Sequence, residues 1–260
     1  MRKFDLIVFD WAGTTVDYGC YAPVLALEEA FKKHGLTPTQ EELRKPMGMG
    51  KWDHINTMLG YPRLNQAWEE ANGSKVDDSA VDAIYASFNE KVLEELGKKE
   101  FSQPKPYVLE TVEKLRADGY KIGGTTGYTR EMMDLVMPGA EEQGYTVDCA
   151  VTSEDVDGLG RPYPYMIFKL MAHFKIEGVD RVLKVGDTVA DIKEAKNAGV
   201  TAAGIIEGSS VMAMREADFN QLDPADQDEL KAKAEKEFKD AGADLVFQNF
   251  ADMYDYLKED

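Results

Sequence analysis

Six short apolar segments are spaced along this chain, and the first of them ends directly on an aspartate. That segment, residues 4–9, is a nearly continuous apolar run with a single acid, which is typical of a parallel strand buried on both faces. Comparable segments are found at 121–124, 148–151, 182–185, 201–206 and 244–247. Helical patterns lie between the later segments, at 107–118, 131–142, 164–174 and 191–198. Strands that alternate with helices predict an α/β fold with a doubly wound, mostly parallel sheet.

One long interval breaks this alternation. From about residue 21 to about residue 99 the pattern is helical, and no segment there is typical of a strand. Such an interval is too long for a loop, so it predicts an inserted helical domain. We expect an α/β core formed by residues 1–19 and 100–260, and a helical domain at 20–99. The hinges between them are expected at 17–20 and 102–106.

Four glycines stand near the ends of the core segments, where a left-handed residue commonly ends a helix. They are Gly119, Gly144, Gly178 and Gly199. We expect them to cap the helices that precede them.

The chain is strongly acidic, because 48 Asp and Glu residues outnumber 30 Lys and Arg residues and give a net charge of −18. Such a charge repels phosphate backbones and anionic lipids, so we expect no nucleic-acid partner and no membrane partner. The first apolar run is too short for a signal-peptide core or a membrane span. Two cysteines, Cys20 and Cys149, provide neither a disulfide framework nor a thiolate metal site. We expect a soluble cytoplasmic protein.

Polar side chains follow three of the predicted strands. Asp10 follows the first, Thr126 and Gly127 follow the second, and Asp187 follows the fourth, with Asp191 four residues later. Ligands of open α/β sheets bind beyond the carboxyl ends of the strands, so we expect these residues to meet at one edge. A single aspartate there has about even odds of being only a helix N-cap, but several at successive strand ends are harder to explain that way. Carboxylates gathered in this way predict a site for Mg²⁺.

This arrangement resembles the haloacid dehalogenase superfamily of phosphotransfer hydrolases. In that superfamily, an Asp after the first strand attacks phosphorus and a Thr or Ser after the second binds a phosphoryl oxygen. A Lys or Arg before a later helix supplies positive charge, and a Gly-Asp-x-x-x-Asp run completes the Mg²⁺ site. The resemblance covers essentially the whole chain. It implies that Asp10 is the nucleophile, that Thr126 and Gly127 bind the phosphoryl group, and that the helices of 20–99 form a cap. It also implies that Arg161 supplies the positive charge and that Asp187 is a metal ligand.

One position departs from the phosphatases and phosphomutases of that superfamily. Those enzymes carry a second Asp two residues after the nucleophile, which protonates the leaving oxygen and later activates water. Here the position is Ala12, which offers only its backbone carbonyl, expected as a ligand of Mg²⁺. General acid catalysis contributes about 10²–10⁴-fold, so its absence disfavours the hydrolysis of an ordinary phosphate ester.

Three longer segments resemble one family within the superfamily, the phosphonoacetaldehyde hydrolases or phosphonatases. The segments are 9–20, 44–54 and 124–134. In that family a cap lysine forms a Schiff base with the substrate aldehyde, and the matching residue is Lys51. Met47, Cys20 and Tyr128 lie inside the matched segments and are expected to line the site. The resemblance also implies a homodimer formed through the cap.

The chemistry of a carbon–phosphorus bond gives this resemblance a physical reason. Cleavage would expel a poor carbanion, which no simple acid can rescue, whereas an imine on Lys51 can accept the electron pair as an enamine. Asp10 could then attack phosphorus and form an aspartyl phosphate that water hydrolyses. His54 lies three residues after Lys51 and is expected to share its helix face and transfer protons to it. The expected activity is therefore Mg²⁺-dependent hydrolysis of phosphonoacetaldehyde, a small anionic phosphonate, to acetaldehyde and phosphate.

Three other functions remain open at this point. A cap-bearing phosphatase or phosphomutase acting on a small phosphorylated metabolite is disfavoured by Ala12 together with Lys51. A hydrolytic dehalogenase would use the same aspartate without metal, and the run that begins with Gly186 and Asp187 argues against it. A catalytically inactive binding module would be expected to lack the nucleophile or the metal ligand, and this chain has both.

Overall fold

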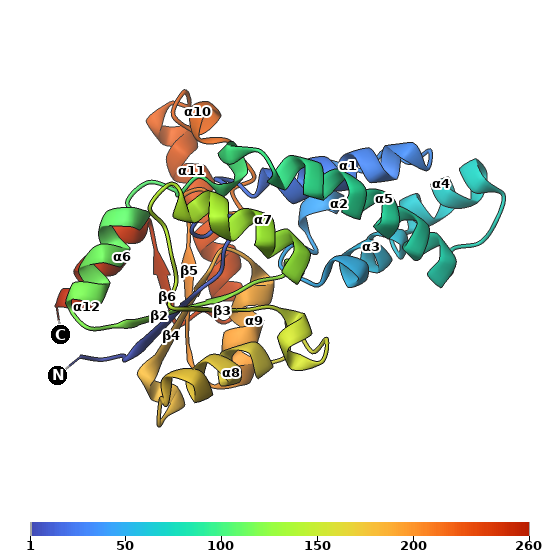
Figure 1. Cartoon of the computed structure of the whole chain (residues 1–260). Helices are drawn as coiled ribbons and strands as arrows, with labels where there is room; N and C mark the ends of the chain where they lie inside the picture. Colours follow the sequence, from blue (N-terminus) through green and yellow to red (C-terminus); the bar gives the residue numbers. More distant parts are fainter. Residues whose placement is uncertain (1, 260) are drawn as a thin grey trace.

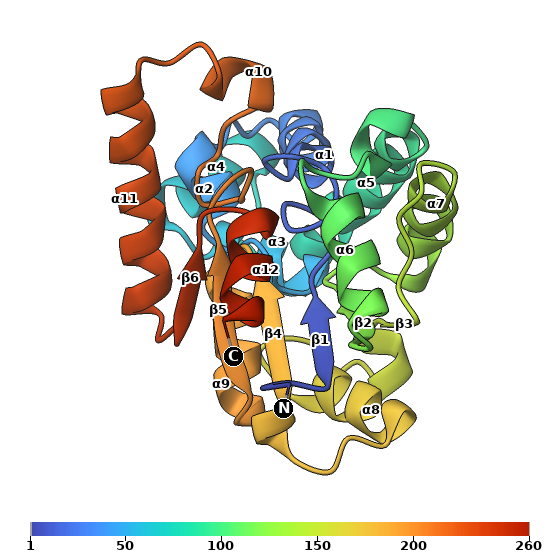
Figure 2. The ribbon, with the colours of Figure 1, turned by 90° about the vertical axis from the view of Figure 1, so that its left-hand side faces the viewer.

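The computed structural model describes residues 2–259 and contains a six-stranded sheet in which every pairing is parallel. The strands run in the order β3-β2-β1-β4-β5-β6, which can be followed in Figure 2. They are β1 (Leu6–Phe9), β2 (Lys121–Thr125), β3 (Cys149–Val151), β4 (Val182–Gly186), β5 (Thr201–Ile205) and β6 (Leu245–Phe247). Each of the six apolar segments forms a strand, so the predicted α/β fold with a parallel sheet is confirmed.

Helices cover both faces of the sheet because the buried side chains of each strand alternate between them. Ile7 and Phe9 of β1 belong to the core on one face, whereas Leu6 and Val8 belong to the core on the other. The first face is covered by α6 (Val108–Ala117), α7 (Arg130–Glu141) and α12 (Phe250–Lys258). The second is covered by α8 (Tyr165–Phe174), α9 (Val189–Ala198) and α11 (Pro224–Asp240), and a short α10 (Glu216–Phe219) precedes α11.

The order in which strands are added to the sheet reverses between β1 and β4, while all strands remain parallel. From β1 the chain adds β2 and β3 on one side, and it then returns to add β4, β5 and β6 on the other. Phe9 is paired with Val185, and the backbone N–H of Asp10 donates to the carbonyl of Val185 at 3.0 Å. The residues that directly follow these two central strands therefore lie at the switch point, where open α/β sheets bind their ligands.

The interval between β1 and β2 is helical, as predicted. It contains α1 (Tyr21–Lys33), α2 (Gln40–Arg44), α3 (Lys51–Leu59), α4 (Pro62–Asn72) and α5 (Asp78–Leu96). Figure 1 shows these helices projecting beyond the carboxyl ends of the strands. Buried apolar side chains on α1 and α5, among them Leu27, Phe31, Ile84 and Phe88, pack together inside this insertion. We call the helices α1–α5 the cap.

The two segments that join the cap to the core lie side by side. Val16 forms an isolated antiparallel bridge with Pro104, and the N–H of Lys105 donates to the carbonyl of Thr15 at 2.9 Å. A short 3-10 helix, η1 (Lys99–Ser102), precedes the second segment. Because the two segments are hydrogen-bonded to each other, the chain passes from the core to the cap and back again at adjacent positions.

Three of the four glycines predicted to end helices adopt the left-handed conformation, namely Gly119, Gly144 and Gly199. Gly178 is the exception, and that prediction is wrong. Helix α8 ends earlier, at Phe174, and its C-cap residue Lys175 adopts a left-handed φ of 56°. Gly178 has an extended φ of −139° and precedes a second 3-10 helix, η3 (Val179–Arg181), while η2 (Ser153–Val156) follows β3.

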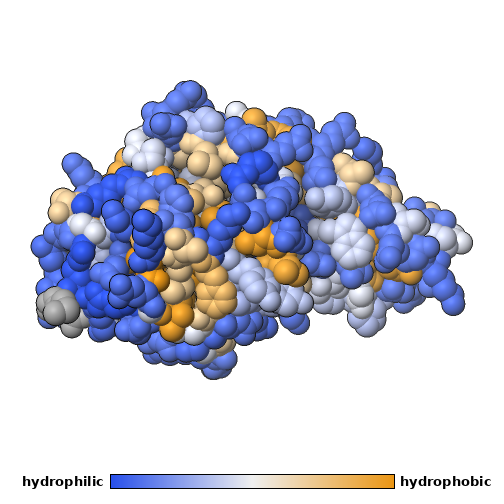
Figure 3. Space-filling model, turned by 60° about the horizontal axis from the view of Figure 1, so that its bottom comes forward, coloured by the Kyte–Doolittle hydropathy of each residue, from blue (hydrophilic) through white to orange (hydrophobic). Residues whose placement is uncertain are grey.

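The visible face in Figure 3 is largely hydrophilic, with apolar areas scattered among charged side chains. Within residues 2–259, no helix has the length and apolar character that a membrane span requires.

Candidate active site

A small cavity of about 20 Å³ lies where the carboxyl ends of the strands meet the cap. It contains nine of the residues singled out from the sequence: Asp10, Ala12, Cys20, Met47, Lys51, Thr126, Gly127, Tyr128 and Arg161. Three further residues complete its wall, namely Gly48, Thr188 and Ser210. Two other predicted residues, Asp187 and His54, are buried beside the cavity without lining it. We call this the catalytic cavity.

Arg161 and Asp10 form a buried ion pair in this cavity. The guanidinium Nη2 of Arg161 donates to Oδ1 of Asp10 at 2.7 Å, and both side chains are less than a tenth exposed. Arg161 is held in place from behind, because its Nε donates to Glu194 at 2.9 Å and its Nη2 also donates to the carbonyl of Thr125 at 3.0 Å. The side chain therefore presents a fixed positive charge next to Asp10.

Asp187 is a buried carboxylate held by two neighbouring donors. Its Oδ1 accepts from the hydroxyl of Thr14 at 2.9 Å, and its Oδ2 accepts from the N–H of Ser210 at 2.7 Å. Burial, followed by the charges of Asp10 and Asp191, raises the pKa of Asp187 to about 7. A bound cation would remove this penalty, because it would offset the repulsion among the three carboxylates.

The cluster fits a hard divalent cation. Asp10, Asp187 and Asp191 each offer a carboxylate oxygen, and these oxygens lie within 4.8 Å of one another. Asp191 already has cationic partners, since its Oδ1 lies 2.8 Å from Nζ of Lys184 and 3.0 Å from Nη2 of Arg161. These two charges lower the pKa of Asp191 against the effect of burial. Asp187 is thus the carboxylate that a metal would serve best, and Asp10, which Arg161 already neutralises in part, offers a second oxygen.

The loop after Asp10 is shaped to admit Asp187. Gly13 adopts a left-handed φ of +82°, and a Cβ placed on it would lie 2.2 Å from Oδ2 of Asp187. The N–H of Gly13 donates to the carbonyl of Val16 at 2.8 Å, which fixes the peptide plane that carries the Ala12 carbonyl. Nζ of Lys105 donates to the carbonyl of Gly13. Any side chain at this position would displace the carboxylate.

Lys51 is the first residue of α3 and reaches the cavity from the cap. It is 6% exposed, and its Nζ lies 5.9 Å from the ring centre of Tyr128. Burial is the largest influence on its pKa, which it lowers, and the charge of Arg161 lowers it further. Asp10 and Asp187 act in the opposite direction without reversing the shift. The environment therefore makes the neutral amine, which is the nucleophilic form, easier to reach than in an exposed lysine.

His54 lies one turn after Lys51 and is fully buried. Its Nε2 lies 2.9 Å from the carbonyl of Leu43, so this nitrogen carries the proton, and Nδ1 has no hydrogen-bond partner among residues 2–259. Burial and then the charge of Lys51 lower the pKa of His54 to about 3. The ring is therefore neutral at physiological pH and has one free acceptor nitrogen.

The segment after β2 closely approaches the loop between α2 and α3, residues 45–50, which we call the cap loop. A Cβ on Gly127 would lie 3.1 Å from the carbonyl oxygen of Met49 and 3.2 Å from that of Gly48. The hydroxyl of Thr126 accepts from the N–H of Tyr128 at 3.1 Å. The cap loop therefore rests directly on Gly127 and narrows the space above the ends of the strands.

Several residues of the site were not found from the sequence. Glu194 forms an ion pair with Arg161, and Lys184 forms one with Asp191. Thr188 and Ser210 complete the cavity wall. Glu194 lies three residues after Asp191, so helical spacing could have placed both on one face of α9. No comparable sequence signal points to Ser210, which reaches the site only because the chain turns back after β5.

Comparison with known proteins agrees with this geometry. A family model for haloacid dehalogenase-like hydrolases matches residues 4–199. The phosphonoacetaldehyde hydrolase of Lysinibacillus sphaericus is 42% identical over 251 residues, covering 96% of this chain and 93% of that protein. The bifunctional phosphonoacetaldehyde hydrolase/aminoethylphosphonate transaminase of Clostridioides difficile is 43% identical over 259 residues, and the match covers 98% of this chain but 40% of that longer protein. The crystal structure of a phosphonoacetaldehyde hydrolase-like protein from Oleispira antarctica superposes with a TM-score of 0.94 at 34% identity, covering 99% of this chain and 92% of that one.

Proposed function

The chain belongs to the haloacid dehalogenase-like hydrolases, and within them to the phosphonoacetaldehyde hydrolases, and we propose that it hydrolyses the carbon–phosphorus bond of phosphonoacetaldehyde to acetaldehyde and phosphate. The observation that carries this proposal is the presence of Lys51 in one cavity with Asp10 and Ala12. A phosphatase needs an acid at position 12 and has no use for a buried amine. A carbon–phosphorus hydrolase needs the amine and no acid there.

The first step is condensation of the Lys51 amine with the substrate aldehyde. The nitrogen attacks the carbonyl carbon, water leaves, and the product is a protonated imine. Burial of Lys51 supports this step, because the amine must be neutral to attack. The neighbouring Arg161 also disfavours a second positive charge.

The second step transfers the phosphoryl group to Asp10. Its carboxylate attacks phosphorus, the carbon–phosphorus bond breaks, and the released electron pair is taken up by the imine, which becomes an enamine. Arg161 would neutralise oxygens of the phosphonate, and Thr126 and Gly127 would bind the same group from the end of β2. Preorganised charge of this kind stabilises the transition state because it needs no rearrangement during the reaction.

Asp10, Asp187 and the carbonyl of Ala12 would hold Mg²⁺, which would supply positive charge between the nucleophile and the anionic substrate. The enamine then takes a proton on carbon, and water releases acetaldehyde from Lys51. Water also hydrolyses the aspartyl phosphate and frees Asp10.

His54 is the group that we assign to proton transfer at Lys51. Its free Nδ1 can accept a proton, and its position one helical turn from Lys51 supports this role. Cys20, Met47 and Tyr128 would enclose the two-carbon part of the substrate, since they line the same cavity. We also propose that residues 20–99 form a separate cap domain that opens to admit substrate, and that two copies of the chain associate through it.

Borohydride trapping tests the central step. Added with phosphonoacetaldehyde, borohydride should reduce the imine to a stable secondary amine and abolish activity. Mass spectrometry should locate on Lys51 an added ethyl group, or a phosphonoethyl group where reduction precedes cleavage. Lys51→Arg should be inactive, because a guanidinium keeps the charge but forms no imine. Lys45→Arg, a change at an exposed lysine of the same cap, is the matched control and should remain active and trappable.

The same experiment distinguishes a phosphatase. A phosphatase would show no adduct at Lys51, would tolerate Lys51→Arg, and would gain activity from Ala12→Asp. Cleavage of the carbon–phosphorus bond without any adduct would exclude the Schiff base and leave Lys51 as a binding charge.

A further inference from the structure

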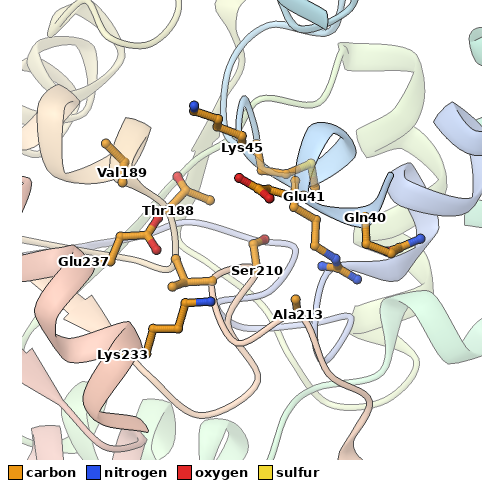
Figure 4. A pocket seen from close by; sticks show the side chains of 12 residues that line it. Gln40, Glu41, Lys45, Thr188, Val189, Ser210, Ala213, Lys233 and Glu237 are labelled. Atoms are coloured by element: carbon orange, nitrogen blue, oxygen red, sulfur yellow. The ribbon is translucent and has the colours of Figure 1, made fainter. Parts of the chain in front are cut away.

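A second and much larger cavity lies next to the catalytic cavity. Its volume is about 470 Å³, within the usual range for sites that bind small molecules. Its lining comes from α2 and the cap loop that follows it, from the segments after β4 and β5, and from α11, as Figure 4 shows. The buried part of its wall is formed by Arg44, Met47, Thr188 and Ser210. We call this cavity the antechamber.

The two cavities share one wall. Met47, Thr188 and Ser210 line both of them. The catalytic cavity, at about 20 Å³, has room for little more than a water molecule, so a phosphonate must reach it by displacement of part of its wall. The cap loop closes the shared wall, since Gly48 packs so tightly on Thr188 that a Cβ there would lie 2.3 Å from the threonine hydroxyl. Displacement of this loop would join the two cavities.

The antechamber has a positive lining in an acidic protein. Three cationic side chains, Arg44, Lys45 and Lys233, face two acidic ones, Glu41 and Glu237, whereas the whole chain carries a net charge of −18. In Figure 4 the Lys233 side chain extends from α11 toward Ser210 in the shared wall. This is the local positive charge that an anionic substrate needs to approach such a protein.

Arg44 contributes a charge that its surroundings do not fully satisfy. It is 9% exposed, and its Nη1 donates to the carbonyl of Gly19 at 2.7 Å. Its Nε and Nη2 have no hydrogen-bond acceptor among residues 2–259. Its guanidinium carbon lies 4.7 Å from the ring centre of Tyr21. Among residues 2–259 no carboxylate forms an ion pair with it, although its charge lowers the pKa of the buried Asp17 against the larger effect of burial. A buried cation of this kind favours an anion nearby.

We propose that the antechamber is the route by which the phosphonate enters and phosphate leaves, and that Lys233 and Arg44 attract the dianion to it. This inference rests on the proposed function for the identity of the substrate. Lys233 belongs to α11, which lies outside residues 4–199, the part matched by the family model. The two acidic side chains keep binding weak, as a passage requires, because tight binding would retain the anion outside the catalytic cavity.

Charge reversal at Lys233 tests the route. Lys233→Glu should lower kcat/KM and raise the inhibition constant of inorganic phosphate by about tenfold each at low salt, with kcat unchanged. The differences should shrink at high salt, because screening weakens the interaction of exposed charges. Lys236→Glu is the matched control, since Lys236 lies on the same helix and pairs with Asp240 on the exposed surface. Equal effects of the two variants would refute the inference.

Filling the antechamber provides an independent test. Val189 lines this cavity but not the catalytic one, and it is half-buried at the start of α9. Val189→Trp should lower kcat/KM at least tenfold by obstruction, whereas Val179→Trp, the same change at an exposed valine of η3 that lines neither cavity, should behave like wild type. Equal kinetics of the two variants would show that substrate takes another route.

These outcomes are separable from failure of the proposed function. Inorganic phosphate is released by phosphatases and phosphonatases alike, so its inhibition constant can be measured with any substrate that the enzyme turns over. Carbon–phosphorus cleavage without a response to Lys233→Glu would refute the antechamber alone. A response to Lys233→Glu in an enzyme that cleaves only phosphate esters would refute the phosphonatase proposal alone.

Discussion

Nη2 of Arg161 lies 2.7 Å from Oδ1 of Asp10, although 151 residues separate them in the chain. The same guanidinium is bound by Glu194 and Asp191, so one cation is shared among three buried carboxylates. The contact places the expected nucleophile directly beside the charge expected to bind the phosphonate. The position of Asp10 therefore depends on the ion pairs that Arg161 forms with all three carboxylates.

Removal of the Asp10 charge should abolish turnover. Asp10→Asn keeps nearly the same shape but cannot attack phosphorus as a carboxylate, so phosphate release should fall to background while the fold is retained. Asp5→Asn is the control, because Asp5 precedes the same strand but pairs with Arg181 near the surface. Substantial turnover by Asp10→Asn, with deamidation excluded by mass spectrometry, would remove Asp10 from the role of nucleophile.

Removal of Arg161 should affect both binding and stability. Arg161→Ala should chiefly raise KM, and it should also lower the free energy of unfolding by about 3–5 kcal/mol, because it leaves buried carboxylates without their partner. Urea denaturation measures the second effect. Arg181→Ala breaks the more exposed pair with Asp5 and should cost at most about 1 kcal/mol. If both variants behaved like wild type in KM, Arg161 would be a structural residue only.

Mg²⁺ should stabilise the protein as well as activate it. The ion would offset the repulsion that raises the pKa of Asp187, and at one hundred times its Kd it should add about 2.7 kcal/mol to the free energy of unfolding. Thermal unfolding with Mg²⁺ and with a chelator measures this, and Asp187→Asn should remove most of the increase. Full activity after exhaustive chelation would contradict the metal site and favour a dehalogenase.

Gly13→Ala should inactivate the enzyme through a clash and not merely through backbone strain. A Cβ at Gly13 would lie 2.2 Å from Oδ2 of Asp187, so the carboxylate or the loop must move, and turnover and Mg²⁺ affinity should fall together. Gly158→Ala isolates the strain, because Gly158 has a similar φ of +80° with no atom within 4 Å of the added Cβ. That control should lose about 1–2 kcal/mol of stability and remain active. Equal activity of the two variants would contradict the close approach.

His54 should make the protein less stable as pH falls below neutrality. Its pKa is about 3 in the folded state and about 6.5 in an unfolded chain, so between these values only the unfolded state binds the proton. The free energy of unfolding should therefore fall by about 2 kcal/mol between pH 7.5 and pH 5 from this residue alone. His54→Gln should remove this contribution in urea denaturation at several pH values.

A control and an opposing group complete this test. His173→Gln, on the exposed part of α8, should keep the wild-type dependence on pH. Asp17, whose pKa burial raises to about 7, acts in the opposite direction, since its folded state binds the proton more readily. Comparison of each variant with wild type cancels that effect. An unchanged slope for His54→Gln would show that the ring is protonated in the folded protein.

Much of the fold was predictable because its signals are local. Six apolar runs with helical patterns between them mark the strands, and the rule that parallel strands end at one edge brings Asp10, Thr126 and Asp187 together before any coordinates are known. The long helical interval marked the insertion. The prediction that Gly178 ends a helix was wrong for a local reason as well, since Lys175 adopts the left-handed conformation three residues earlier.

Lys51 and Arg161 could be singled out only by resemblance to a family. The hydrophobic periodicity of α3 does not indicate that its first residue, Lys51, lines the catalytic cavity. The sequence determined which residue types stand at the strand ends and in the cap, since those depend on the order of residues along the chain. Only the tertiary structure decided that Glu194 pairs with Arg161, that Lys184 pairs with Asp191, that Ser210 completes the catalytic cavity, and that Lys233 lines the neighbouring antechamber. The physical reason is that these contacts depend on how separate elements pack in space. The order of residues along one helix or strand does not determine which charged or bulky side chains another element places against it.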